Sequence, residues 1–290
     1  MTDADDGGTV APPTRVRKER GRDGARFLSP VVRRLASERG IDASRVHGTG
    51  RGGRATRDDL LAADAETIIP FSPLRRTAAR RLVESKATAA HAHVVVECDY
   101  HAVNRVRRDA GITYLPFVAR AVIDALREFP LCNATVAGED ITVHDAVNLG
   151  IAVDLEHEDL VVPVVHDAHT LRLRALATRI GDVAERARGR HLQPDDVTGG
   201  TFTITNPGPF GTIVSMPVIN IPQVAILATD AVRPRAVVVR ADADADAIAV
   251  HPVGVLALGF DHRVVSLTTA SAFVARVRDL VEGRDWATEL

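Results

Sequence analysis

Apolar residues recur every three or four positions in three stretches of the chain, residues 116–128, 171–187 and 270–281. This spacing places an apolar stripe along each segment and predicts three helices that pack against a core. Residues 75–86 predict a further helix. These helices belong to a large domain that we place at residues 68–290.

Short β-like runs lie between the predicted helices. They are residues 94–99, 201–205, 224–229, 236–239 and 253–260. Strands and helices are interspersed without a strict β-α-β alternation, and we find no glycine-rich nucleotide loop. The pattern therefore predicts an α+β fold, a mixed-sheet sandwich, and argues against a doubly wound nucleotide-binding fold.

The beginning of the chain has a different character. Residues 1–26 combine Gly, Pro, Asp and Arg with scattered apolar positions, so we expect a disordered linker. Residues 27–64 show a short helical pattern, a glycine-rich turn at residues 48–53 and a second helix that Thr56 can cap. This predicts a mini-domain of two helices around a glycine loop, with a core of marginal size.

Composition narrows the classes of function. The formal net charge of −2 offers no general attraction to nucleic acid or to an anionic membrane. Two cysteines cannot build a disulfide framework, and no apolar stretch approaches the roughly 18 residues that span a bilayer. The acidic, polar N-terminus does not resemble a signal peptide. We therefore expect a soluble cytoplasmic protein with no nucleic-acid or membrane partner.

The first candidate for chemistry is a histidine at the end of a predicted strand. The apolar run 253–260 is followed directly by Asp261, His262 and Arg263. A strand that ends in an imidazole can hold a general base rigidly at the mouth of a pocket. Taken alone, the same pattern also fits a solvated loop histidine.

A second segment favours the catalytic interpretation. Residues 199–211 form a β-like run that ends in hydroxyl and amide side chains, Thr205 and Asn206, and continues into a tight glycine turn. Such an arrangement can present a hydroxyl group to an oxyanion.

Together these segments resemble the catalytic core of the dihydrolipoamide acyltransferases of 2-oxo acid dehydrogenase complexes. The resemblance covers about residues 68–285 and rests on ordered motifs at residues 73–76 with 81–82 and 84–86, 148–153, 199–203, 218–223 and 261–263. Residues 27–60 are similar to the peripheral subunit-binding domain of the same family, through motifs at residues 29–30, 33–36, 40–42, 46–54 and 58–60.

The resemblance implies the fold of chloramphenicol acetyltransferase and a homotrimer or larger homo-oligomer with active sites between subunits. It implies that His262 of one chain removes a proton from the attacking thiol or hydroxyl. Thr205 of a neighbour, which stands where the family has serine, would hydrogen-bond the tetrahedral oxyanion. The same motifs imply supporting roles for Asp261, Arg263, Asn206, Ser266 and Arg75, and a substrate channel along His93, Gly199, Gly200 and Gly208.

The chain departs from the family motif directly after the histidine. Where the family has Asp-Gly, this sequence has Ser266 and Leu267. The family aspartate pairs with an arginine near the start of the core, here Arg75, and serine cannot form that ion pair. Removing one partner of a buried pair costs on the order of 3–5 kcal/mol when the other is left uncompensated. We therefore expect Arg75 to have another partner, the pocket to be rebuilt, or catalysis to be weakened or lost.

The family carries its acyl group on a lipoyl domain, and we find no such module in this sequence. The 26 residues before the mini-domain contain one lysine, Lys18, without strands around it. We therefore expect no lipoyl group on this chain and no permanently bound cofactor, with acyl-CoA as cosubstrate. The other partner would be a separate lipoyl protein, an acyl carrier or a small-molecule acceptor.

Three functions remain open at this stage. The first, which we favour, is transfer of an acetyl-type group from acyl-CoA to a hydroxyl group of a specialised metabolite, such as a polyketide tetronate in antibiotic biosynthesis. The second is the acyltransferase core of a 2-oxo acid dehydrogenase complex that uses a lipoyl protein in trans. In that case Arg33, Arg34, Arg51 and Arg54 of the mini-domain would dock a dehydrogenase partner. The third is a non-catalytic scaffold.

Other polar clusters predict no further site. His157 lies among acidic residues, but their spacing fits no helical or hairpin ligand set, so we predict no metal. Of His91 and His93, which flank the first predicted strand, one can line the acceptor channel, although a structural role is the simpler interpretation.

Overall fold

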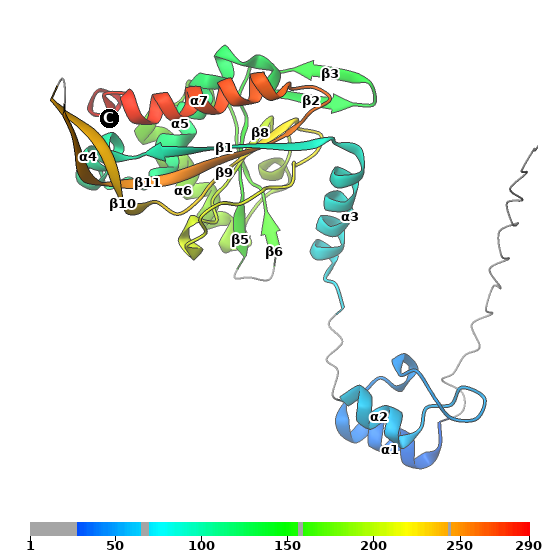
Figure 1. The fold of residues 1–290 in the computed structure, drawn as a ribbon. Coiled ribbons are helices and arrows are strands. Elements are labelled where there is room, and N and C mark those ends of the chain that lie inside the picture. Colours follow the sequence, from blue (N-terminus) through cyan, green and yellow to red (C-terminus); the bar gives the residue numbers. More distant parts are fainter. Residues whose placement is uncertain (1–27, 65–69, 156–158, 243–244) are drawn as a thin grey trace, which may run out of the picture. The chain divides into compact units, whose positions relative to one another are not determined.

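The structure is a computed structural model in which residues 28–64, 70–155, 159–242 and 245–290 are described. The chain divides into two compact units, Met1–Pro70 and Phe71–Leu290 (Figure 1). The described residues form seven α-helices and eleven β-strands. The expected linker at residues 1–26 and the segment around His157 lie outside the described residues. In the described ranges, none of the helices combines the length and the apolar character needed to cross a bilayer.

The small unit contains two helices, α1 (Pro30–Arg39) and α2 (Arg57–Asp64), as the sequence predicts. The hydroxyl of Ser29 accepts the N–H of Val32 at 3.2 Å and so caps the start of α1. Gly40 ends the helix in the left-handed conformation, with φ of 66°. The buried apolar residues of this unit are Val32, Ala36 and Leu60.

Asp59 ties the glycine loop of the small unit to α2. Its carboxylate accepts the backbone N–H groups of Thr49 and Thr56 and the hydroxyl of Thr49, each at 2.8 Å. These bonds, with the Thr49 N–H contributing most, lower the pKa of Asp59 far below its usual range. The ionised carboxylate therefore holds the loop, and a protonated carboxyl would accept these hydrogen bonds more weakly.

We expect the small unit to lose stability in acid. Because the pKa of Asp59 is lower in the folded unit, its contribution is fully present above the usual carboxyl pKa of about 4 and is lost as pH falls through the folded value. Asp59→Asn should lower the melting temperature at neutral pH and flatten its pH dependence, as circular dichroism of residues 27–64 would measure. Asp58→Asn, an exposed position on the same helix, is the control. Equal acid sensitivity of the two variants would contradict the assignment.

A seven-stranded sheet forms the centre of the large unit (Figure 1). The strand order is β1-β11-β9-β8-β4-β7, and β10 pairs with the first half of β11. The pairs β4–β8 and β8–β9 are parallel and the others are antiparallel, which confirms the predicted mixed-sheet α+β fold. The strands are β1 (His91–Asp99), β4 (Leu149–Ile151), β7 (Val164–Val165), β8 (Phe202–Thr205), β9 (Ala225–Thr229), β10 (Arg233–Asp242) and β11 (Ala245–Asp261).

The remaining elements surround this sheet. Two antiparallel pairs stand outside it, β2 (Ala134–Ala137) with β3 (Asp140–Val143) and β5 (Val153–Leu155) with β6 (Asp159–Val161). The helices are α3 (Pro73–Thr88), α4 (His101–Ala110), α5 (Tyr114–Glu128), α6 (Leu173–Arg188) and α7 (Leu267–Gly283). The four helices predicted in this domain are confirmed as α3, α5, α6 and α7, whereas α4 was not foreseen.

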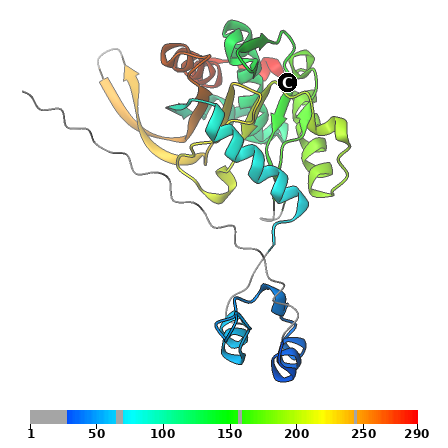
Figure 2. The ribbon, with the colours of Figure 1, turned by 90° about the vertical axis from the view of Figure 1, so that its right-hand side faces the viewer.

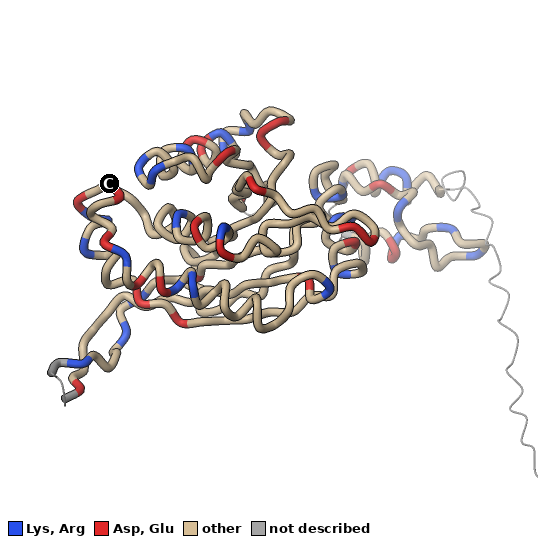
Figure 3. Tube along the Cα trace, turned by 90° about the horizontal axis from the view of Figure 1, so that it is seen from above, with Lys and Arg blue, Asp and Glu red and all other residues tan. Residues whose placement is uncertain are grey.

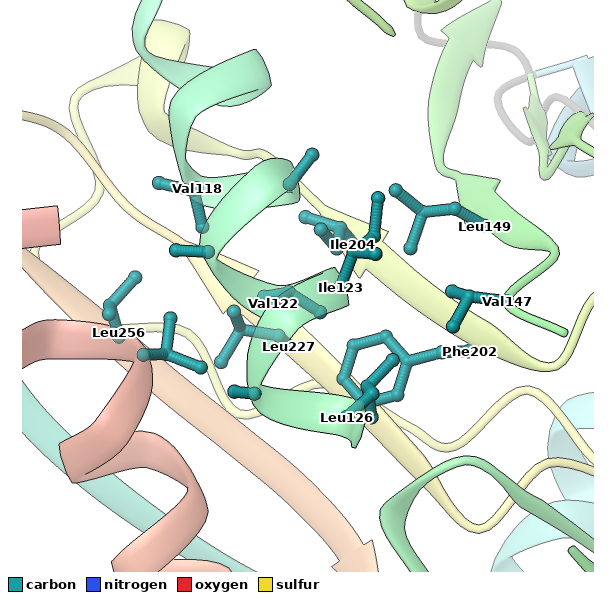
Figure 4. Close-up of a cluster of buried hydrophobic side chains, with 14 of the residues drawn as sticks. Val118, Val122, Ile123, Leu126, Val147, Leu149, Phe202, Ile204, Leu227 and Leu256 are labelled. Carbon is teal, nitrogen blue, oxygen red and sulfur yellow. The ribbon is translucent and has the colours of Figure 1, made fainter. Parts of the chain in front are cut away.

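The core lies where α5 crosses the central strands. Nearly every residue of α5 from Pro116 to Leu126 is buried, and the helix packs against both α6 and α7. Figure 4 shows this packing, with α5 side chains set against those of the strands β4, β8, β9 and β11. Charged residues of both signs lie along the outer helices, while the central strands are largely uncharged (Figure 3).

β11 is twice as long as the predicted strand. Its second half is flanked by β1 and β9, whereas its first half pairs only with β10 in a two-stranded ribbon that projects from the sheet (Figure 2). On that ribbon Val238 and Ile248 face each other and are 71% and 80% exposed. The sequence run 253–260 revealed only the buried half, because only there are both faces of the strand covered.

Candidate active site

His262 directly follows the last residue of β11. Its backbone N–H donates to the carbonyl of Ala90, 2.9 Å away, and this bond fixes it to the segment that enters β1. The imidazole is exposed, and its ring centroid lies 5.6 Å from that of Phe260. The strand end therefore presents the ring at the surface, where an external nucleophile can reach it.

Asp261 and Arg263, on either side of the histidine, are joined by an ion pair. The buried carboxylate of Asp261 accepts Nη2 of Arg263 at 2.6 Å and Nε at 3.0 Å, together with the backbone N–H of Ala90 at 3.2 Å. Burial alone would raise the pKa of Asp261, but the hydrogen bonds from Arg263 and Ala90 outweigh it and lower the pKa. Asp261 is thus an ionised anchor for the turn and not a second acid or base.

Ser266, which replaces the expected aspartate, starts the next helix. Its hydroxyl oxygen accepts the N–H of Thr269 at 3.1 Å and lies 2.9 Å from the Thr269 hydroxyl, which caps α7. Arg75 lies in the first turn of α3, where its N–H bonds to the hydroxyl of Ser72 at 3.0 Å. The residue that departs from the motif therefore caps the start of α7, and its hydroxyl bonds to Thr269.

A cavity of about 620 Å³ opens beside the turn that carries His262. Gly199 and Gly200, expected along the channel, line it together with Asp261 and Arg263. A Cβ at position 200 would lie 3.0 Å from the amide nitrogen of Gln223, so the Gln223 side chain would have to shift to admit it. Further lining residues are Arg81, Glu84, Thr198, Asn220 and Gln223.

One wall of this cavity is held by buried amide and hydroxyl groups. The Thr203 hydroxyl donates to Oε1 of Gln223 at 2.6 Å, and Nδ2 of Asn220 donates to the Thr203 hydroxyl at 3.4 Å. Thr203 and Gln223 are both buried. In the sequence analysis, Asn220 and Gln223 have no assigned role. Two polar amides within the otherwise apolar segment 217–227 could have indicated a buried hydrogen-bonding role.

The two histidines of β1 bind the segment that precedes β9. Nε2 of His93 lies 3.0 Å from the carbonyl oxygen of Pro217, and the ring packs against Gly259 of β11. His93 is not among the residues that line the 620 Å³ cavity. His91, for which a structural role was the simpler interpretation, lies between the carbonyl of Ala89 and the N–H of Ile219.

Thr205 ends β8 and is half-buried. The next residue, Asn206, forms a tight turn in which its Oδ1 accepts the N–H of Gly208 at 3.2 Å. A Cβ at position 208 would lie 2.9 Å both from this Oδ1 and from the carbonyl oxygen of Asp230. Glycine is therefore required here for the turn that follows the Thr205 strand.

A second cavity, of about 950 Å³, lies at this end of the sheet. Asn206 and Gly208 line it, together with Arg174 and Arg188 of α6 and Arg233 at the start of β10. Asp230 also lines this cavity, where it accepts the Ser215 hydroxyl at 2.7 Å and the Ser215 N–H at 3.0 Å. The three guanidinium groups, which come from distant parts of the sequence, make this cavity suitable for an anionic ligand.

Thr205 and His262 do not meet within one protomer. Thr205 pairs with Ala228 of β9, which pairs with Ala257 of β11, so Thr205 is level with Ala257 across the sheet. His262 lies five residues further along the chain, a distance of about 16 Å at about 3.3 Å per residue. The two candidate catalytic groups therefore stand towards opposite ends of the strands, each beside its own cavity.

Within the described residues, we find neither a reactive cysteine nor a metal site that would be an alternative to His262 and Thr205. Burial raises the pKa of Cys132 to about 12, and it raises that of Cys98 still further. Both stay protonated at neutral pH and are poor nucleophiles. In the described ranges no three His, Cys, Asp or Glu side chains lie close enough together to hold a metal ion.

Comparison with known families matches both units. Residues 63–288 match the 2-oxoacid dehydrogenases acyltransferase catalytic domain, and residues 26–61 match the e3 binding domain. Over 289 residues the chain is 32% identical to the dihydrolipoyllysine-residue succinyltransferase component of the Escherichia coli K12 2-oxoglutarate dehydrogenase complex, with 88% of this chain and 70% of that protein covered. It is 34% identical over 308 residues to the acetyltransferase component of the Corynebacterium glutamicum pyruvate dehydrogenase complex, with 92% and 45% covered.

A solved structure resembles the large unit closely. Azotobacter vinelandii dihydrolipoamide acetyltransferase superposes with a TM-score of 0.70 at 28% identity, over 78% of this chain and 94% of that chain. That structure comes from an investigation of the roles of a serine, a histidine and an asparagine in its catalytic mechanism. Its asparagine follows its histidine at the same spacing at which Ser266 follows His262.

Proposed function

The chain belongs to the 2-oxoacid dehydrogenase acyltransferase family, and from this premise we propose that it transfers an acyl group between a dihydrolipoyl group and CoA. The named relatives act on dihydrolipoyllysine residues. They therefore support the second candidate from the sequence, a 2-oxo acid dehydrogenase acyltransferase, over the hydroxyl acceptor that we favoured first. The presence of an imidazole and a hydroxyl at the two key positions supports an active enzyme over a scaffold.

His262 acts as the general base in this reaction. It removes the proton from the CoA thiol, and the resulting thiolate attacks the carbonyl carbon of the acyl-dihydrolipoyl thioester. The Thr205 hydroxyl donates a hydrogen bond to the oxyanion of the tetrahedral intermediate. The intermediate then expels the dihydrolipoyl thiolate, which takes the proton back from the imidazolium. Acyl-CoA and dihydrolipoamide are the products.

The observation that carries this proposal is the separation of the two groups within one protomer. A general base and an oxyanion donor must both contact one reacting carbonyl, so an intramolecular gap of about 16 Å along the strand requires His262 of one copy to meet Thr205 of another. A closed ring of copies with heterologous interfaces provides one such site per interface. We propose the homotrimer, or a larger assembly of trimers, that the family resemblance implies.

CoA would occupy the 950 Å³ cavity beside Thr205. CoA carries phosphate groups, and Arg174, Arg188 and Arg233 line that cavity. The dihydrolipoyl arm would then enter from the 620 Å³ cavity beside His262 of the neighbouring copy. The lipoyl group would come from a domain outside the two described units, and no cofactor needs to stay bound.

Removal of these arginines should weaken CoA binding and leave the chemical step largely intact. We expect Arg174→Ala and Arg188→Ala each to raise KM for CoA by about tenfold, the loss of about 1.4 kcal/mol from one charge-assisted contact, with little change in kcat. Arg179→Ala is the matched control, since Arg179 is exposed on the same helix but does not line the cavity. Steady-state kinetics with varied CoA measures the effect, and equal KM values in all three variants would count against this assignment.

The small unit would dock a partner enzyme of the complex. Its match to an e3 binding domain supports this role, and Arg33, Arg34, Arg51 and Arg54 are all exposed on it. Exposed arginines suit an acidic partner surface, and such an interaction weakens as salt screens it.

One experiment distinguishes the proposed function from the alternatives. The purified chain is incubated with acetyl-CoA or succinyl-CoA and either a reduced lipoylated domain or a panel of hydroxyl acceptors, and acylated products are identified by mass spectrometry. Transfer to the dihydrolipoyl thiol is the expected result. Transfer only to a hydroxyl group would favour the first candidate, and no transfer to either would favour the scaffold.

A further inference from the structure

Ile219 is hydrogen-bonded through its carbonyl group to the last turn of α3 and through its N–H group to the first residue of β1. The hydroxyl of Ser85, itself buried, donates to the Ile219 carbonyl oxygen at 2.6 Å. The Ile219 N–H donates to Nε2 of His91 at 3.1 Å. Ala90, next to His91, binds the backbone N–H of His262. One short stretch of chain therefore holds both the general base and the segment that leads to the wall of its cavity.

The hydrogen bonds of His91 define its protonation state. A backbone N–H can only donate, so Nε2 must carry a free lone pair to accept the Ile219 N–H. Nδ1 lies 3.1 Å from the carbonyl oxygen of Ala89, which can only accept, so Nδ1 must carry the proton. Both bonds are satisfied only in the neutral ring with the proton on Nδ1. A second proton on Nε2 would point at the Ile219 N–H and break that bond.

The segment that His91 holds continues into the cavity wall. Asn220 follows Ile219 directly, and Gln223 lies three residues after Asn220. Both side chains hydrogen-bond the hydroxyl of Thr203, and both residues line the 620 Å³ cavity. If the Ile219 peptide were released, this wall would lose a tether on the side nearest His262. Misplacement of a substrate-positioning wall by about 1 Å can cost about 10²-fold in rate.

We propose that His91 is a positioning residue of the acyl-transfer site, whose neutral ring fixes the Ile219 segment beside His262 and releases it on protonation. This inference rests on the proposed function for its effect on catalysis. The geometry on which it stands, a histidine locked in one tautomer between two backbone groups, is independent of that function.

The surroundings of His91 favour the neutral ring. Burial lowers its pKa most, and Lys86 of α3 and His93 of β1 lower it further, while the Ala89 carbonyl and Asp261 of β11 act in the opposite direction. The net pKa lies below the usual value of a histidine. Because the folded pKa is lowered, the tether is fully present above the unfolded value of about 6.5 and is lost as pH falls through the folded one.

Two variants distinguish loss of the hydrogen bond to Ile219 from protonation of the His91 ring. His91→Gln offers a side-chain oxygen as acceptor but cannot be protonated, so it should keep kcat near the wild-type value at about pH 8 and keep the tether in acid. His91→Phe has no acceptor, so we expect it to lower kcat by about 10–100-fold at any pH. His101→Gln is the matched control, because His101 is an exposed histidine that follows the opposite end of β1. Circular dichroism and gel filtration report on folding and assembly of each variant.

Hydrogen exchange provides a readout that does not depend on activity. In the full chain, the peptide covering residues 217–223 should lose protection as pH falls through the lowered pKa of folded His91, after correction for the intrinsic pH dependence of exchange. In His91→Gln the protection should stay constant. The inference is overturned if His91→Gln and the wild type lose protection in parallel, or if His91→Phe leaves both exchange and kcat unchanged. If exchange responds as expected but the wild type transfers no acyl group, the proposed function fails and the tether stands.

Discussion

Replacement of His262 by alanine lowers kcat by about 10²–10⁴-fold, the usual contribution of a general base. The reason is that the neighbouring carboxylate of this turn, Asp261, is already bound by Arg263 and Ala90 and cannot replace the imidazole. The fold should persist, because the imidazole is at the surface while the backbone of residue 262 makes the bond to Ala90. Discontinuous assays of acyl-CoA formation measure this change in kcat.

His47→Ala is the control for this prediction, because it removes an exposed histidine from the small unit instead of the large one. It should leave kcat with a free lipoylated domain unchanged. Wild-type turnover by His262→Ala would show that the base lies elsewhere, and would remove the main support for the mechanism.

Replacement of Thr205 by alanine should lower kcat by about 10²–10³-fold, as loss of one oxyanion donor does in other acyl-transfer enzymes. Thr205→Ser keeps the hydroxyl and should retain most of the activity, which separates the hydrogen bond from the methyl group. Thr203→Ser, two residues earlier on β8, keeps its bond to Gln223 and should change kcat little. Equal losses in the alanine and serine variants at position 205 would argue for packing instead of oxyanion binding.

Mixed oligomers test whether the two residues act across an interface. Neither His262→Ala nor Thr205→Ala has a complete site as a homo-oligomer. When the two are co-expressed, about one quarter of the interfaces in randomly mixed rings combine an intact His262 with an intact Thr205. Activity should return to that fraction. If the pair acts within one protomer instead, mixing restores nothing.

The fourth residue after His262 differs between this chain and the A. vinelandii enzyme. The A. vinelandii enzyme has an asparagine of catalytic interest at the spacing of Ser266. Here the residue is a serine whose hydroxyl caps α7. The shorter side chain therefore serves the start of a helix, and under our proposal the hydroxyl of Thr205 makes the oxyanion contact.

Much of the fold followed from local patterns. Helices α5, α6 and α7 were predicted because one face of each is buried, and an apolar stripe at helical spacing is a property of the sequence. Helix α4 was missed, since only Val103 is buried in it and its pattern is mostly polar. The first half of β11 was missed for the same reason, because a ribbon with exposed faces needs no continuous apolar run.

By itself, the sequence determined the residue types of the candidate site and the order of its motifs. His262, Thr205 and the glycines at positions 199, 200 and 208 are local signals, each next to the strand or turn that it needs. Only the tertiary structure decided which of them come together. Strand register places Thr205 level with Ala257, far from His262, and gathers Arg174, Arg188 and Arg233 around one cavity. Register and long-range packing depend on contacts between segments far apart in the chain, and a linear pattern does not contain them.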